Sequence, residues 1–101
     1  MLYNKLVRDK IPDIIKSKGE TAVTHIATEA EYREALAKKL HEETDEFIAK
    51  PSAEEAADIM EVILAFAKLN NLDLSGLEEL RKRKSAERGG FEKRIILDET
   101  K

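Results

Sequence analysis

Two long stretches of the 101-residue chain carry apolar residues at helical spacing, and a Lys-Pro-Ser linker separates them. The first stretch follows Thr28 and extends to about Ala49, and the second follows Ser52 and extends to about Leu69. Each opens with a hydroxyl residue that is followed three positions later by glutamate, which is the pattern of a capping box. Because the linker is short, we expect the two helices to pack antiparallel to each other.

The flanking segments carry shorter signals. Apolar spacing with Pro12 favours a short helix over about residues 8–18, since proline is tolerated in a first turn. Ser75 with Glu78 repeats the capping-box pattern and predicts a third long helix that extends to about Ala86.

Two segments near the ends of the chain predict strands. Residues 21–27 (TAVTHIA) and 93–97 (KRIIL) are rich in β-branched residues, so we expect each to form a short strand and the two to pair. The expected fold is mainly all-α, an antiparallel helix bundle with a short terminal β-ribbon. No internal repeat or low-complexity linker interrupts the chain, which favours a single domain over residues 1–101.

Composition limits the classes of function. The chain is 42% hydrophobic and 39% charged but only 5% aromatic, a balance typical of long helices. Its net charge of -3 predicts no nucleic-acid partner, and the absence of cysteine excludes thiolate metal sites and fits a cytoplasmic location. No apolar run approaches the roughly 20 residues of a membrane span, so we expect no membrane partner.

The acidic run LHEETDEF (residues 40–47) divides by helical phase. At about 100° per residue, the first long helix carries one apolar stripe about 80° wide, formed by Tyr32, Leu36, Leu40 and Phe47. Glu43 falls inside this stripe and Glu46 at its edge, whereas Glu42 lies on a flank and Asp45 on the solvent side. The phase therefore predicts that Glu43 and Glu46 face inward.

The second long helix is apolar over roughly 200° of its circumference, which is wider than one contact face. This arc contains Ile59, Met60, Val62, Ile63, Leu64, Phe66 and Ala67. Such a helix lies centrally in a bundle or is shared with another subunit. Glu55 projects within the arc and Asp58 lies at its border, so two more carboxylates are expected to face inward.

The four inward carboxylates fall into two pairs spaced i,i+3, Glu43 with Glu46 and Glu55 with Asp58. Four such groups need a counter-charge, because an unpaired buried ion is costly. A divalent cation would satisfy them, and oxygen ligands suit Mg²⁺ or Mn²⁺.

Two alternatives stay open at this point. Glu55 could serve only as the capping-box partner of Ser52. The carboxylates of the first helix could instead pair with Lys39, Lys50 or a basic residue elsewhere, since charge-rich helices often carry acids at i,i+3.

Three blocks of the sequence resemble a known family. EETDE (residues 42–46) followed by EAAD (residues 55–58) resembles the EExxE…ExxD signature of the MazG-like all-α nucleoside triphosphate pyrophosphohydrolases. YNKLVRDKIP at the start and ERGGFEKRIIL near the end resemble a small single-domain branch, described as phosphoribosyl-ATP pyrophosphohydrolase-like. The three blocks in this order cover nearly the whole chain.

The resemblance implies a house-cleaning enzyme that hydrolyses a canonical or modified nucleoside triphosphate to monophosphate and pyrophosphate. It implies Mg²⁺ ligands at Glu43, Glu46, Glu55 and Asp58, with Mn²⁺ as a substitute. We expect a carboxylate, Glu42 or Glu46, to accept the proton of the attacking water. The resemblance also implies an assembly of at least two chains, a homodimer or homotetramer.

The triphosphate also requires positive charge. Lys84 and Arg88 are spaced i,i+4 at the end of the third long helix, before two glycines, and are candidates to bind phosphate. Lys5 and Arg8 in the first block are further candidates, although a salt bridge to the acidic helices would also explain them. Phe91 is the candidate to stack on a base.

Two alternative functions compete with this one. Within enzymes, the substrate could be phosphoribosyl-ATP of histidine synthesis, since a shared fold does not fix the substrate. Outside enzymes, the chain could be a non-catalytic helical module whose wide apolar helix serves only dimerisation.

Overall fold

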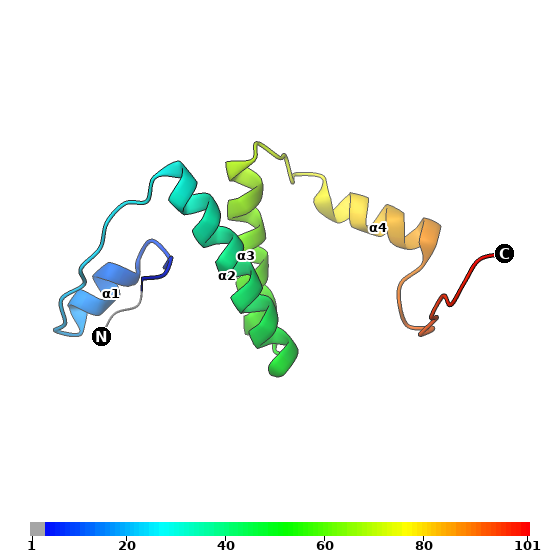
Figure 1. Cartoon of the computed structure of the whole chain (residues 1–101), viewed down its shortest axis with the longest axis horizontal. Helices are drawn as coiled ribbons and strands as arrows, with labels where there is room; N and C mark the ends of the chain where they lie inside the picture. The colour runs from blue at the N-terminus through cyan, green and yellow to red at the C-terminus, as the bar shows by residue number, and fades with distance from the viewer. Residues whose placement is uncertain (1–3) are drawn as a thin grey trace.

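The computed structural model describes residues 4–101 and contains four α-helices. In chain order they are α1 (Ile11–Ser17), α2 (Glu29–Ala49), α3 (Ala53–Leu69) and α4 (Leu77–Arg88) (Figure 1). None of these helices has the length and apolarity that crossing a membrane requires. The described residues contain no strand, so the prediction of a mainly all-α fold is confirmed.

The centre of the molecule is an antiparallel hairpin of α2 and α3, which residues 50–52 connect (Figure 1). Its buried apolar side chains are Leu36 from α2 and Val62 and Ala67 from α3. Within the described part of the chain no other pair of helices is in contact. The predicted antiparallel bundle is therefore present as this one pair.

Both hairpin helices begin where the sequence predicts. The Thr28 hydroxyl accepts a hydrogen bond from the backbone N–H of Glu31 at 3.2 Å, and α2 starts at the next residue. The Ser52 hydroxyl accepts one from the backbone N–H of Glu55 at 3.1 Å and starts α3. These caps satisfy backbone donors that have no partner inside the helix.

The short N-terminal helix is present as α1, over fewer residues than predicted. It has Pro12 in its first turn, where the missing backbone N–H costs no helical hydrogen bond. The chain leaves the helix through Gly19, whose φ of 85° favours glycine.

The capping box predicted at Ser75 is wrong. The backbone N–H of Ser75 donates to Oδ1 of Asp73 at 2.9 Å, so this residue belongs to a turn and α4 begins at Leu77 without a side-chain cap. Glu78 pairs instead with Arg81, whose guanidinium lies 2.6 Å from Oε1 and lowers the pKa of the Glu78 carboxyl. The helix continues to Arg88, beyond the predicted end.

The predicted β-ribbon is also wrong. Residues 21–27 and 93–97 lie in opposite arms of the chain (Figure 1) and neither forms a strand. A two-stranded ribbon needs a packed face to be stable, and here Val23 is 95% exposed and Ile95 80% exposed. Arg94 has a φ of 57°, which also interrupts an extended conformation within the second segment.

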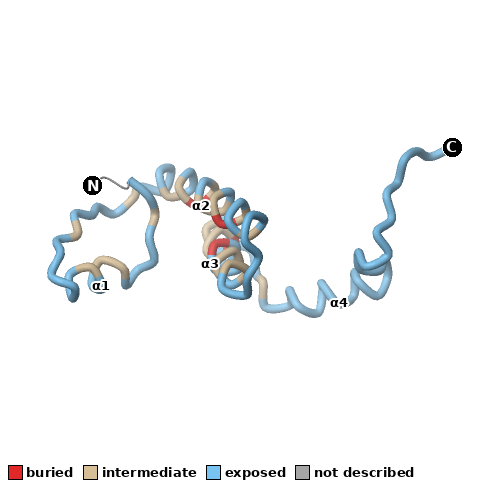
Figure 2. Tube along the Cα trace, turned by 90° about the horizontal axis from the view of Figure 1, so that it is seen from below, coloured by how far each residue is buried: buried red, intermediate tan, exposed pale blue. Residues whose placement is uncertain are grey.

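The chain on its own is extended. It measures 61 × 31 × 25 Å with a radius of gyration of 18.2 Å, whereas a compact domain of this length has about 13 Å. Its accessible surface is 9651 Å², against about 5,800 Å² for a compact monomer of this mass. Figure 2 shows that the buried residues are confined to α2 and α3, so both arms lie outside the only core of the described residues.

Candidate metal centre

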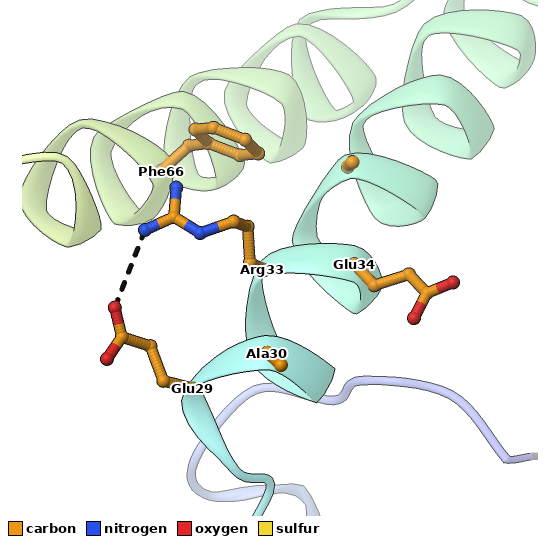
Figure 3. Close-up of a pocket in the computed structure, with 6 residues that line it drawn as sticks. Glu29, Ala30, Arg33, Glu34 and Phe66 are labelled. Carbon is orange, nitrogen blue, oxygen red and sulfur yellow. Dashed lines mark ion pairs between the residues drawn. The ribbon is translucent and has the colours of Figure 1, made fainter.

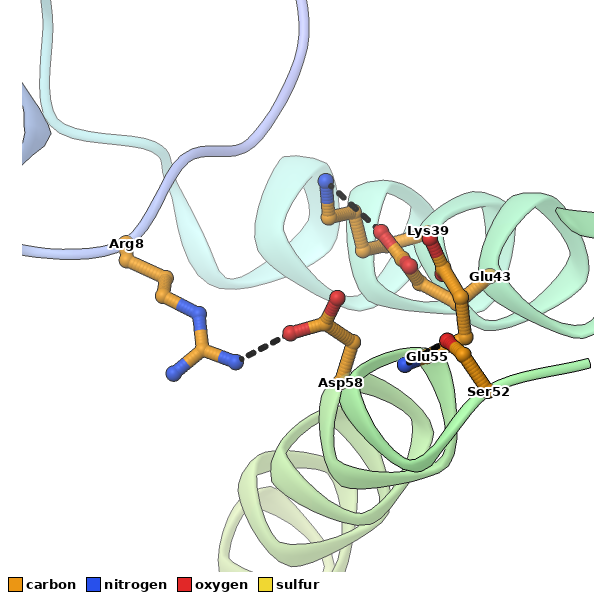
Figure 4. A network of polar contacts seen from close by, with 6 residues as sticks. All are labelled: Arg8, Lys39, Glu43, Ser52, Glu55 and Asp58. Carbon is orange, nitrogen blue, oxygen red and sulfur yellow. Dashed lines mark hydrogen bonds and ion pairs between the residues drawn. The ribbon is translucent and has the colours of Figure 1, made fainter. Parts of the chain in front are cut away.

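Three carboxylates meet near the closed end of the hairpin (Figure 4). Glu43 comes from α2, while Glu55 and Asp58 come from the first two turns of α3. One carboxylate oxygen from each lies within 4.8 Å of the others, and such a group could hold a metal ion. The Ser52 cap fixes where α3 begins, and thereby fixes the phase that turns both α3 carboxylates toward α2.

Glu43 is a buried acid in the middle of an apolar stripe. Only 8% of the residue is exposed, although glutamate is seldom buried unless it is paired. Nζ of Lys39, one turn earlier on α2, lies 3.3 Å from Oε1 of Glu43. Glu43 therefore both faces inward, as predicted, and pairs with Lys39, which was the alternative explanation.

Glu55 has the least compensated charge of the three. Its Oε2 is buried and has no hydrogen-bond partner. Burial raises the pKa of the Glu55 carboxyl above its ordinary value. The negative charges of three neighbouring carboxylates raise it further, those of Glu46, Glu43 and Asp58. A buried oxygen of this kind is the group to which a cation would contribute most.

Asp58 is paired with a residue from the other side of the sequence. Nη2 of Arg8, in the segment before α1, lies 2.7 Å from Oδ1 of Asp58 (Figure 4). Both side chains are partly open to solvent, at 57% for Arg8 and 40% for Asp58. Arg8 therefore forms a salt bridge to an acidic helix, which was the alternative to phosphate binding.

The other two acids of the motif lie outside this three-carboxylate group. Glu46 is exposed, although it is close enough for its charge to raise the pKa of Glu55. Glu42 is half-buried on α2. The predicted inward orientation is thus found for Glu43 but not for Glu46, because a position at the edge of the apolar stripe stays in contact with water.

The basic candidates divide between the two arms of the chain. Arg8 reaches the carboxylates, and Lys5 is exposed three residues earlier. Lys84 and Arg88 are exposed on α4, which extends from the opposite end of the hairpin and does not contact it (Figure 1). The structure therefore does not bring the α4 residues to the carboxylates of the same chain.

A groove that no sequence pattern predicts lies at the open end of the hairpin (Figure 3). It has a volume of about 670 Å³ and is lined by Glu29, Ala30, Arg33, Glu34, Ala37 and Phe66. Arg33 is held there by Oε1 of Glu29 at 3.5 Å and Oδ1 of Asn70 at 2.8 Å. None of the three clustered carboxylates lines it, so the groove is separate from the candidate metal centre.

The donor set of the centre fits a hard divalent cation. All three groups offer oxygen, which Mg²⁺ and Mn²⁺ prefer, and one of these oxygens is buried without a partner. Lys39 pairs with Glu43 and Arg8 pairs with Asp58, which leaves Glu55 as the carboxylate of the three without an ionic partner. The site can therefore accept further positive charge.

Comparisons of the chain with protein-family models, with curated proteins and with solved structures found no match. Membership of the MazG-like family is therefore a prediction that rests on the residues of the chain itself.

Proposed function

We propose that the chain is a Mg²⁺-dependent nucleotide pyrophosphohydrolase of the MazG-like type, which converts a nucleoside triphosphate to monophosphate and pyrophosphate. The observation that supports this most is the convergence of Glu43, Glu55 and Asp58, with oxygens within 4.8 Å of one another and one of them buried without a partner. A cytoplasmic location accompanies this proposal, as the cysteine-free sequence favours.

Each acid has a role in this proposal. Glu43, Glu55 and Asp58 hold the cation, and Glu46 completes the set from the solvent side. When bound, Mg²⁺ would neutralise charge on the triphosphate and orient it for in-line attack. Glu46 is exposed and acts electrostatically on Glu55, so we assign to it, ahead of Glu42, the proton of the attacking water.

Positive charge for the phosphates comes from two sources in this proposal. Arg8 pairs with Asp58 of its own chain, and Lys5 lies three positions earlier in the sequence, so we propose that both bind phosphate at the site of their own chain. Lys84 and Arg88 are too far along the other arm to do so, and we propose that they serve the site of a second copy.

A second copy also accounts for the exposed apolar surface. The accessible surface exceeds that of a compact monomer by an amount larger than the roughly 800 Å² per partner of a standard interface. Helix α3 exposes three large apolar side chains, Met60, Ile63 and Leu64, at 63%, 40% and 47%. We therefore propose a homodimer or homotetramer in which these side chains are covered.

The test of the activity uses a panel of canonical and modified nucleoside triphosphates with phosphoribosyl-ATP, in Mg²⁺, and detects released pyrophosphate. Glu43→Gln should lower turnover by at least about 100-fold, because it removes a charged ligand from a centre that stabilises the transition state. The matched control is Asp45→Asn, an exposed acid two positions away, which should keep activity. Absence of turnover on every substrate would reject the proposed activity.

The competing hypothesis of a non-catalytic dimerisation module has one supporting observation. Lys39 and Arg8 already neutralise part of the cluster, so the carboxylates also have a structural explanation. That hypothesis predicts the same melting temperature with and without Mg²⁺. The proposed function predicts a higher melting temperature in Mg²⁺, because a cation that binds only the folded state stabilises it.

A further inference from the structure

The ion pair of Arg8 with Asp58 joins a loop to the candidate metal centre. Arg8 lies in the segment before α1, and α1 itself does not contact the hairpin. The guanidinium reaches across 50 positions of sequence to Oδ1 of Asp58, at 2.7 Å (Figure 4). The arginine therefore occupies an oxygen of a residue that, under the proposed function, is a cation ligand.

Charge balance makes this contact exchangeable. The carboxylates of Glu43, Glu55 and Asp58 carry three negative charges, and Lys39 and Arg8 supply two positive ones. The buried Oε2 of Glu55 is the part left without a partner. If a divalent cation replaces Arg8, the three carboxylates together with Lys39 have no net charge, and the exposed carboxylate of Glu46 is the one negative charge of the proposed set that remains. The attraction that holds the guanidinium at Asp58 is then much weaker.

Arg8 can leave the site more readily than Lys39. Lys39 is fixed on the same helix as Glu43, one turn away, and its side chain is only 23% exposed. Arg8 is on a loop and its side chain is 57% exposed. A guanidinium released into solvent beside the centre can hold phosphate oxygens bidentately, which ammonium groups do not do.

We propose that Arg8 is an exchangeable counter-ion: it binds Asp58 while no cation is present, is displaced by a divalent cation, and then binds a phosphate of the substrate. The inference rests on the proposed function for the identity of the substrate. The exchange itself is a property of the cation site and can be tested without catalysis.

The first arm of the experiment titrates Mn²⁺ alone into the full chain and follows binding by electron paramagnetic resonance. Arg8→Gln should bind Mn²⁺ about two- to fivefold more tightly than the wild type, because a partly exposed ion pair no longer competes. Arg8→Lys keeps the charge and should remain within about twofold of the wild type. The control is Arg33→Gln, which removes an arginine paired at the far end of the hairpin and should change nothing.

The second arm measures binding of inorganic tripolyphosphate in saturating Mg²⁺ by calorimetry. Here Arg8→Gln should bind roughly three- to tenfold more weakly, since a charged hydrogen-bond donor to phosphate is lost. Opposite shifts in the two arms are the signature of exchange. A merely structural role for Arg8 would weaken both.

The outcomes are separable. Mn²⁺ affinity that is unchanged or weaker in Arg8→Gln overturns the exchange, and so does the absence of Mn²⁺ binding by the wild type. Tighter Mn²⁺ binding with unchanged tripolyphosphate affinity overturns the phosphate role. If both arms behave as expected but no nucleotide is hydrolysed, only the proposed activity fails.

Discussion

A carboxylate oxygen that is buried without a hydrogen-bond donor is costly to ionise, and Oε2 of Glu55 is in that position. The negative charges around it add repulsion. A bound cation removes both costs at once. At the scale of single residues, Glu55 should therefore couple cation binding to stability more directly than its exposed neighbours.

Glu55→Gln should abolish that coupling. We expect the metal-free variant to be at least as stable as the wild type, because the substitution removes one of several like charges. At ten times Kd, Mg²⁺ should stabilise the wild type by about 1.4 kcal/mol, or roughly 5–10 °C in melting temperature, and leave the variant unchanged. Differential scanning fluorimetry with and without Mg²⁺ measures both. Asp45→Asn should behave as the wild type, and an equal gain in Glu55→Gln would contradict the assignment.

At the scale of the helices, the turn at residues 50–52 determines how the carboxylates of α3 are oriented. The Ser52 cap determines the first residue of α3 and hence the direction in which Glu55 and Asp58 project. The cap of α2 at Thr28 has the same chemistry but lies at the other end of the hairpin. The two caps therefore form a matched pair.

Ser52→Ala and Thr28→Ala should each cost about 1 kcal/mol in the free energy of unfolding, the usual effect of losing a side-chain cap. Only Ser52→Ala should also weaken Mn²⁺ binding, because only its helix end carries the proposed cation ligands. Urea denaturation and an Mn²⁺ titration measure the two effects. Equal loss of Mn²⁺ affinity in both variants would mean that stability in general, and not the phase of α3, controls the site.

The predictions that succeeded depend on neighbours in the sequence. Capping at Thr28 and Ser52 and the inward phase of Glu43 require only residues within one helical turn. At Ser75 the same local logic failed, because Asp73 offered a competing acceptor two residues earlier. The choice between a cap and a turn is decided by small differences in local hydrogen bonding, and the pattern of residue types does not resolve them.

Features that depend on distant contacts were predicted less well. The β-branched segments at residues 21–27 and 93–97 have strand propensity, but their large apolar side chains are exposed, and propensity without packing does not make a strand. Arg8 was a candidate for two partners, a phosphate or an acidic helix. Its contact with Asp58 joins residues that are 50 positions apart, and helical periodicity does not predict contacts over such a separation.

For the whole molecule, the extended arm that carries Lys84 and Arg88 makes the proposed assembly of two chains testable. If these residues act on the partner's carboxylates, a site consists of parts from two chains. Two inactive variants should then complement each other, because a mixed dimer contains one site with neither substitution.

Mixing Glu43→Gln chains with Lys84→Ala/Arg88→Ala chains should restore about a quarter of wild-type pyrophosphate release, since half of the dimers are mixed and each has one intact site. Light scattering should confirm a mass of at least two chains of 11.5 kDa in the mixture. Mixing either variant with itself gives the baseline. No recovery above that baseline, in subunits shown to exchange, would place the α4 residues outside the site.

The hairpin also has a consequence for how the molecule assembles. Glu43, Glu55 and Asp58 all lie within residues 43–58, on either side of one short turn. Closing a loop of about ten residues takes on the order of 10–100 ns, and contacts so near in sequence form early in folding. The three carboxylates should thus meet on the nascent hairpin, before either arm makes a distant contact. Under the proposed function, a cation bound there would stabilise chains whose α2 and α3 have paired in the correct register, before the proposed subunits associate.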